Sequence, residues 1–171
     1  GDVYKRQILD CKKQGKVYIH KAIVDKGSIK TGDVIKMSVE KEKRSAIAIH
    51  HSSTHLVHAA LRTVLGDHVQ QKGSLVDENK LRFDFSHTKP LTKEEITKIE
   101  DIVNKEALKN LEVKTELMKL DDALKSGAMA LFGEKYDDDV RVLTMGENSY
   151  SVELCGGCLL YTSPSPRDRV R

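Results

Sequence analysis

The stretch 47-IAIHHSSTHLVHAALRTVLG-66 decides the predicted fold, because it combines a helical period with a concentration of histidines. Apolar residues recur near helical spacing in and just before it, at Ala46, Ile49, Leu56, Ala60 and Val64. Gly66 is the residue type that most often follows the last helical turn. We therefore expect one long helix over residues 42–65. Four of the 7 histidines of the chain fall within this helix.

The spacing of these histidines raises the question of a metal site. His51 and His55 are four residues apart, so a helix places both imidazoles on one face, where they can chelate one ion. His58 is a competing partner of His55, and His50 points elsewhere. The pattern is also compatible with ordinary surface and packing residues. A zinc-protease motif is disfavoured, because it requires Glu directly after the first His, and Ser52 stands there.

A third ligand for such an ion is Cys155, at the end of a predicted strand and directly before Gly156 and Gly157. Two glycines permit a sharp turn and a close approach of the backbone. One thiolate and two imidazoles form a ligand set suited to zinc. The alternative is that Cys155 is a small buried apolar residue. The sequence contains no evident Ser-His-Asp set, which disfavours a covalent mechanism.

The remaining pattern predicts an α+β domain. We expect strands at 16–23, 33–40, 68–76, 80–86, 111–120, 140–145 and 149–155. A second long helix from 92 to about 110 begins with a capping box of Thr92 and Glu95, and a short helix covers about 121–126. This order predicts an antiparallel sheet packed by long helices. The first two strands and the turn between them look like the end of a small β-barrel.

Composition and charge limit the classes of function. Hydrophobic residues make up 39% and charged residues 32% of the chain, and no apolar run approaches the length of a membrane span. Three scattered cysteines do not form a disulfide framework, which favours a reducing compartment. The first seven residues carry a net charge of +1 and the last fourteen +2, so the total of +3 leaves residues 8–157 neutral. No global basic field attracts nucleic acid, and RNA contact would need local lysines.

The two ends differ from the rest of the chain. VYKRQ near the start and CLLYTSPSPRD near the end resemble translated adapter sequence, and the tail contains two of the three prolines with no hydrophobic period. The alternative is a genuine disordered tail. We expect residues 1–7 and 158–171 to be non-native ends, 8–41 to be the end of a β-barrel segment, and 42–157 to form the main domain.

Three motifs, in this order, carry a family resemblance: 51-HSSTHLVHAALRTVLGDHVQQKGSLVDENKLRFDFSH-87, 127-GAMALFGEKYDDDVRV-142 and 151-SVELCGG-157. Together they resemble the editing domain of alanyl-tRNA synthetases and, more distantly, that of threonyl-tRNA synthetases. GSIKTGDVIKMSV at 27–39 resembles the β-barrel that precedes this domain. The resemblance covers about residues 8–157. It implies the fold called the second additional domain of threonyl- and alanyl-tRNA synthetases.

The resemblance implies a zinc site held by His51, His55 and Cys155. The family motif is Cys-Gly-Gly-Thr-His, in which the final His is the fourth ligand. Here Cys158 replaces the Thr and Leu159 replaces the His. This departure begins with the adapter-like tail, which indicates that the fourth ligand was cut off. Cys158 or a water is then the alternative fourth ligand.

The resemblance also implies roles for residues around the ion. It places Thr54 and Gln71 in the editing pocket as catalytic and recognition residues, and Gly156 and Gly157 next to the substrate. From the residue types alone, phosphate contacts are expected from Lys72, Lys80, Lys135 and Arg82, although each can equally be solvated surface. We interpret the neighbouring polar residues as structural: His58, Asp84 and His87.

The implied reaction is hydrolysis of tRNA(Ala) mischarged with serine or glycine, within a parent enzyme that ligates alanine to tRNA(Ala) using ATP. The aminoacylation site itself is not in these residues. Expected partners are the acceptor end of tRNA(Ala), its seryl or glycyl ester and other domains of the parent, in the cytoplasm and without a membrane. The alternatives are a free-standing editing deacylase and a tRNA-binding module without hydrolysis.

Overall fold

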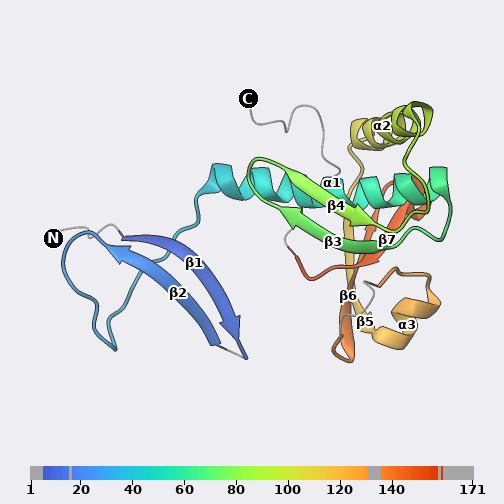
Figure 1. The fold of residues 1–171 in the computed structure, drawn as a ribbon. Coiled ribbons are helices and arrows are strands. Elements are labelled where there is room, and N and C mark those ends of the chain that lie inside the picture. The colour runs from blue at the N-terminus through green and yellow to red at the C-terminus, as the bar shows by residue number, and fades with distance from the viewer. Residues whose placement is uncertain (1–5, 16, 131–135, 158, 160–171) are drawn as a thin grey trace. The chain divides into compact units, whose positions relative to one another are not determined.

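The structure is a computed structural model that describes residues 6–15, 17–130, 136–157 and 159. Its helices are α1 (Lys41–Leu65), α2 (Lys93–Leu108) and α3 (Leu120–Lys125), with a 3-10 turn at Glu147–Ser149. Its strands are β1 (Arg6–Gln14), β2 (Val17–Val24), β3 (Gln71–Val76), β4 (Leu81–Phe85), β5 (Lys114–Lys119), β6 (Asp139–Met145) and β7 (Ser151–Leu154), as Figure 1 shows. The predicted α+β class is confirmed. The chain divides into two compact units, Gly1–Ser38 and Val39–Arg171.

Within its described residues, the first unit contains one antiparallel hairpin, in which β1 pairs with β2 from Arg6↔Val24 to Gln14↔Val17. The strand predicted at 16–23 corresponds to β2, whereas the strand predicted at 33–40 is wrong. Residues 33–40 form no strand, and Val34 is fully exposed, because no described segment offers them a hydrogen-bonding partner. The partner of β2 lies before it instead and includes Arg6 and Gln7, which the adapter interpretation places outside the fold.

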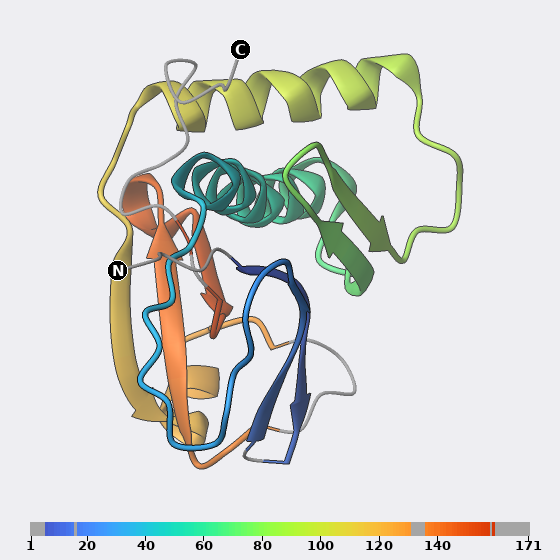
Figure 2. The same ribbon diagram turned by 90° about the vertical axis from the view of Figure 1, so that its left-hand side faces the viewer.

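Helix α1 is the central element of the second unit. It spans 25 residues, and it ends at Gly66, whose positive φ of 111° and N–H bond to the Arg62 carbonyl close the last turn. Its neighbours are α2, the β3–β4 hairpin and β7. Figure 2 looks along α1 and shows α2 on one side of it and the hairpin on another. The helix predicted at 42–65 is confirmed.

Helix α2 begins with the predicted capping box. The Thr92 hydroxyl accepts from the Glu95 N–H at 3.2 Å, and the Glu95 carboxylate accepts from the Thr92 N–H at 2.8 Å. Replacing Thr92 with Ala is expected to lower the free energy of unfolding by about 1 kcal/mol, since one N-terminal N–H loses its acceptor. Urea unfolding measures this, with Thr97→Ala in the middle of α2 as the matched control. Equal unfolding curves for both variants would contradict the prediction.

The described strands of the second unit form two separate antiparallel sheets, so the expectation of one sheet is wrong. One is the β3–β4 hairpin, and the other has the order β5-β6-β7. Met129 forms two backbone hydrogen bonds with β7. Its N–H donates to the Val152 carbonyl at 2.9 Å, and its carbonyl accepts from the Leu154 N–H at 2.8 Å. Strand β7 is thereby held by β6 and by the 127-GAMA-130 segment.

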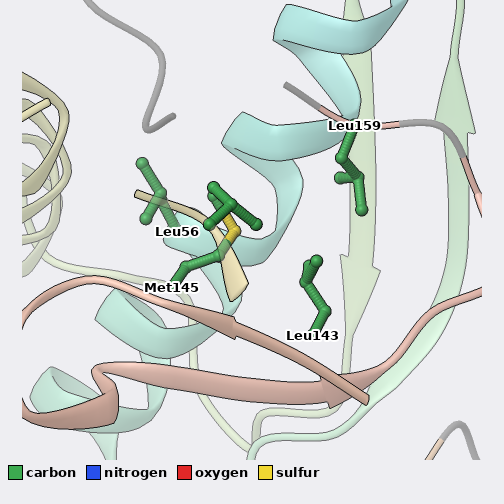
Figure 3. Packing of buried hydrophobic residues seen from close by; sticks show 5 residues of the cluster. Leu56, Leu143, Met145 and Leu159 are labelled. Carbon is green, nitrogen blue, oxygen red and sulfur yellow. The ribbon is translucent and has the colours of Figure 1, made fainter. Parts of the chain in front are cut away.

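A buried apolar cluster joins α1 to the three-stranded sheet. It consists of Leu56, Val113, Leu143, Met145 and Leu159, and Figure 3 shows how their side chains pack. Leu159 belongs to the segment expected to be an unfolded tail, yet its side chain is 8% exposed in this cluster.

Within the described residues, none of the helices combines the length and the apolar character that a membrane crossing requires.

Candidate metal centre

Three side chains from distant parts of the sequence meet beside α1. His51 and His55 project from consecutive turns of the helix, and Cys155 follows the last residue of β7. Their ligand atoms all lie within 4.8 Å of one another. The Cys155 Sγ is 3.5 Å from the His51 Nε2, and the two imidazoles stack with their centroids 5.3 Å apart. The structure therefore brings together the three residues that the sequence singled out as ligands.

The turn that carries Cys155 is held by Arg141 of β6. The Cys155 N–H donates to the Arg141 carbonyl at 3.0 Å, and the Arg141 guanidinium donates to the Gly157 carbonyl at 2.8 Å. One residue thus fixes both ends of the Cys155–Gly157 turn. Sequence reasoning did not identify Arg141, and its position on the strand next to β7 became evident only from the β6–β7 register.

The two glycines after Cys155 differ in how closely other atoms approach them. A Cβ added to Gly157 would lie 2.1 Å from the Cε1 of His51, so no side chain fits between the turn and the imidazole. A Cβ added to Gly156 would meet nothing within 4 Å. Gly157 is therefore required for the close approach of the turn to His51, and Gly156 is not.

Glu153 is a member of this centre that sequence reasoning missed. It is 4% exposed, and its carboxylate accepts from the His55 Nδ1 at 2.8 Å, the His58 Nδ1 at 3.1 Å and the Ser151 hydroxyl at 3.0 Å. The sequence signal was the strand period of two, which places Ser151 and Glu153 on one face of β7, four and two residues before Cys155. His58, predicted to be structural, is buried against this carboxylate.

The three ionisable groups of the centre stabilise one another in charged form. Burial opposes the charge on His55, but Cys155 and Glu153 outweigh it and raise the pKa of His55 to about 9. Burial also opposes the Glu153 carboxylate, yet the donors His55 and His58 lower the pKa of Glu153 to about 2. In the same way, His51 and His55 overcome burial and lower the pKa of the Cys155 thiol to about 6.

The residues present fit a tetrahedral metal ion. With Zn–S near 2.3 Å and Zn–N near 2.0–2.1 Å, tetrahedral geometry separates a sulfur and a nitrogen ligand by about 3.6 Å. The separation of the Cys155 Sγ from the His51 Nε2 is 3.5 Å. Glu153 engages the Nδ1 of His55, and within the described residues the buried Nε2 of His55 has no hydrogen-bond partner. A buried nitrogen beside a sulfur is a position that a bound ion would satisfy.

Metal affinity is expected to depend on pH because the ion must displace protons. At neutral pH the Cys155 thiolate is formed, since its pKa is about 6, while His55 carries a proton because its pKa is about 9. Between pH 6.5 and 8.5 one proton leaves per ion, so affinity rises about tenfold per pH unit. Below pH 6 the metal affinity rises more steeply with pH, because the ion must then displace a proton from Cys155 as well. Isothermal titration across this range measures the slope, and an affinity independent of pH would contradict it.

The two residues expected in the editing pocket lie on different elements. Thr54 is on α1 between the two histidines and is 5% exposed, and its hydroxyl donates to the His50 carbonyl at 2.9 Å. Gln71 begins β3 and is partly buried, and its amide donates to the Ser74 hydroxyl at 3.2 Å. The metal-ligand group does not include them, and their pocket role stays a prediction.

The expected phosphate-binding residues lie on the β3–β4 hairpin. Arg82 forms an ion pair with Asp84 at 3.1 Å, and the ammonium of Lys72 lies 3.4 Å from the Gln70 side chain. Lys80 is exposed.

His87, which was predicted to be structural, stacks on His68, and their ring nitrogens are 2.9 Å apart. Two predicted residues, Lys135 and Cys158, lie outside the described residues.

Fold and centre together define an α+β protein with a His/His/Cys group able to hold a metal ion. No model of a protein family matches the chain. The chain is 54% identical to the alanine--tRNA ligase of Rhodopseudomonas palustris over 155 residues, which cover 85% of the chain and 17% of that protein. It is 55% identical to the alanine--tRNA ligase of Parvibaculum lavamentivorans, with the same coverage of each, and 54% identical to that of Pseudomonas savastanoi pv. phaseolicola, covering 92% of the chain and 18% of the relative.

The chain therefore matches a fragment of alanyl-tRNA synthetase, the enzyme called alanine--tRNA ligase, and the resemblance of its motifs to this synthetase is confirmed. It spans less than one fifth of the length of these relatives.

Proposed function

We propose that this chain is an editing portion of an alanine--tRNA ligase and that it hydrolyses tRNA(Ala) mischarged with serine or glycine. The observation that carries the proposal is the His51, His55 and Cys155 group, which lies in a chain whose relatives are alanine--tRNA ligases. The parent enzyme would join alanine to tRNA(Ala) with ATP in the cytoplasm, through domains outside this chain. The acceptor end of tRNA(Ala) would reach the centre with its aminoacyl ester.

His51, His55 and Cys155 would hold the ion, which we propose to be zinc because two imidazoles and a thiolate suit it. Bound zinc supplies positive charge that polarises a carbonyl or makes a water more acidic. In the hydrolysis, a water oxygen bonds to the ester carbonyl carbon, and the bond from that carbon to the ribose oxygen breaks. The ribose oxygen takes a proton, which leaves a free amino acid and an uncharged tRNA.

Thr54 and Gln71 would distinguish serine from alanine. A pocket sized for alanine discriminates poorly against a substrate that adds only a hydroxyl, by roughly a hundred-fold. A polar pocket reverses the preference, because alanine leaves its polar groups unpaired at a cost of about 1–3 kcal/mol. The Thr54 hydroxyl donates its proton to the His50 carbonyl, so in this proposal its oxygen would accept a bond from a serine hydroxyl.

A second candidate function follows from the contacts of His55. Its Nδ1 donates to Glu153 at 2.8 Å, and a ring nitrogen of His55 lies within 4.8 Å of the Cys155 sulfur. A thiol, an imidazole and a carboxylate in this order also form a set for covalent hydrolysis through a cysteine. In that case the Cys155 sulfur would bond to the ester carbonyl carbon while the bond from that carbon to the ribose oxygen breaks, and the ribose oxygen would take the proton from the thiol. A water would then cleave the thioester, which releases the amino acid and restores the thiol. Chelation separates the two candidates, since it abolishes only the zinc-dependent reaction.

The test compares the chain with a variant carrying Cys158→Thr and Leu159→His, which restores the family motif. We expect zinc binding and Ser-tRNA(Ala) hydrolysis in the variant, both removed by chelation, and no cleavage of Ala-tRNA(Ala). Zinc-loaded protein that binds tRNA(Ala) but hydrolyses no ester in either form would overturn the proposal in favour of a tRNA-binding module. Hydrolysis that survives chelation would favour the covalent route.

A further inference from the structure

Glu153 connects three donors from two elements through a single buried carboxylate. Oε2 accepts from the His55 Nδ1 at 2.8 Å, while Oε1 accepts from the His58 Nδ1 at 3.1 Å and from the Ser151 hydroxyl at 3.0 Å. The two histidines come from α1 and the other two residues from β7. Both oxygens are occupied, so the carboxylate cannot rotate without losing at least one of these bonds.

The bond to His55 determines which ring nitrogen can meet an ion. A carboxylate that accepts from Nδ1 fixes the proton there, so the lone pair of the neutral ring is on Nε2. Nε2 is the nitrogen of His55 that is buried and, within the described residues, without a hydrogen-bond partner. Without Glu153 the ring could carry its proton on either nitrogen and could turn about its side-chain bonds.

His58 restrains the same carboxylate from the next helical turn. It is 5% exposed, and its ring packs on Phe83 of β4 with centroids 5.2 Å apart. The ring is therefore held between the hairpin and Glu153. This arrangement differs from that of a simple core histidine, because the polar contact of His58 is made to the carboxylate that orients His55.

We propose that Glu153 is a positioning residue for metal binding and that His58 and Ser151 hold it in place. Glu153 presents His55 to the ion in one tautomer and one orientation, and His58 links this orientation to the β3–β4 hairpin. The inference rests on the proposed metal centre. A partner of this kind for a ligating histidine changes metal affinity by about 10- to 100-fold.

The first test replaces Glu153 with Gln in the full chain. The amide has one oxygen and one NH2 group in place of two carboxylate oxygens, so it cannot accept from His55 on one atom and from His58 on the other. We expect zinc and cobalt affinities to fall by about 10- to 100-fold in competition with a chromophoric chelator. The cobalt absorption bands should also shift, because His55 is no longer held in one orientation. Glu100→Gln, an exposed substitution on α2, is the matched control and should leave both unchanged.

The second test separates positioning from packing at His58. His58→Phe keeps a ring against Phe83 and removes the donor to Glu153, whereas His58→Asn keeps a donor near the Nδ1 position and removes the ring. We expect a loss of about 10-fold in cobalt affinity for Phe, at the lower end of the range for such partners, and an affinity close to that of the original chain for Asn. A role in packing alone predicts the opposite order.

The outcomes distinguish this inference from the proposed function. If the unaltered chain binds no zinc or cobalt, the proposed metal centre fails. If it binds the ion and Glu153→Gln binds with the same affinity and the same cobalt spectrum, the centre stands and the positioning role is wrong. A variant with a lower unfolding midpoint in the metal-free form but an unchanged affinity would also overturn the positioning role.

Discussion

Zinc affinity is expected to fall by roughly 100- to 1,000-fold when Cys155 is replaced by Ser. Four-ligand zinc sites bind with about 10–16 kcal/mol, so one ligand contributes about 2.5–4 kcal/mol. Cys155 supplies the thiolate of this centre, and its lowered pKa of about 6 makes that thiolate available at neutral pH. A serine hydroxyl at the same position keeps its proton and is a weak ligand. Competition with a chromophoric chelator measures the loss.

Cys11→Ser is the matched control for this prediction. Cys11 is an exposed cysteine of β1, and it lies in the first unit of the chain, outside the His/His/Cys group. The cobalt-loaded protein should show a sulfur-to-metal charge-transfer band that is unchanged in Cys11→Ser and is weakened or lost in Cys155→Ser. Equal affinities for the two variants would contradict the assignment of Cys155 as a ligand.

The second large effect is expected from a single methyl group at position 157. Gly157→Ala places a Cβ 2.1 Å from the Cε1 of His51 and 2.8 Å from its Nδ1, so either the ring or the turn has to move. The ring is one proposed ligand and the turn carries another, so either movement separates the His51 nitrogen from the Cys155 sulfur. We expect zinc affinity to fall by about 100-fold, comparable to the loss of one ligand.

Gly156→Ala is the control for this substitution, because a Cβ at that position meets no atom within 4 Å. Its zinc affinity and unfolding midpoint should stay close to those of the original chain. Isothermal titration of the two variants compares them directly. An unchanged affinity for Gly157→Ala would mean that the turn does not hold Cys155 against His51 as described.

Local patterns predicted most of the second unit. The helical period and Gly66 located α1, the Thr92 and Glu95 pair located the start of α2, and the alternation of residues 80–86 located β4. These features depend on neighbours in the sequence. Two failures are long-range: whether residues 33–40 find a partner strand, and whether the β3–β4 hairpin joins the three-stranded sheet, depend on pairings that alternation does not encode. Strand β1 was missed as well, although it pairs with the strand that follows it.

For the candidate centre too, the sequence predicted the local relations between residues and missed the long-range ones. The spacing of His51 and His55 was readable, because one helical turn fixes their relation. Glu153 and Arg141 were missed, because their roles arise from a strand laid against α1 and from the β6–β7 register. Leu159 shows a further limit: composition assigned it to an unfolded tail, while its side chain packs with Leu56 and Leu143.

Zinc X-ray absorption spectroscopy of the loaded chain tests the central claim most directly. An ion held by His51, His55 and Cys155 should show sulfur near 2.3 Å and nitrogen neighbours near 2.0–2.1 Å, and Cys155→Ser should lose one sulfur neighbour. A chain that retains no zinc, or a number of sulfur neighbours that is unchanged in Cys155→Ser, would contradict the account.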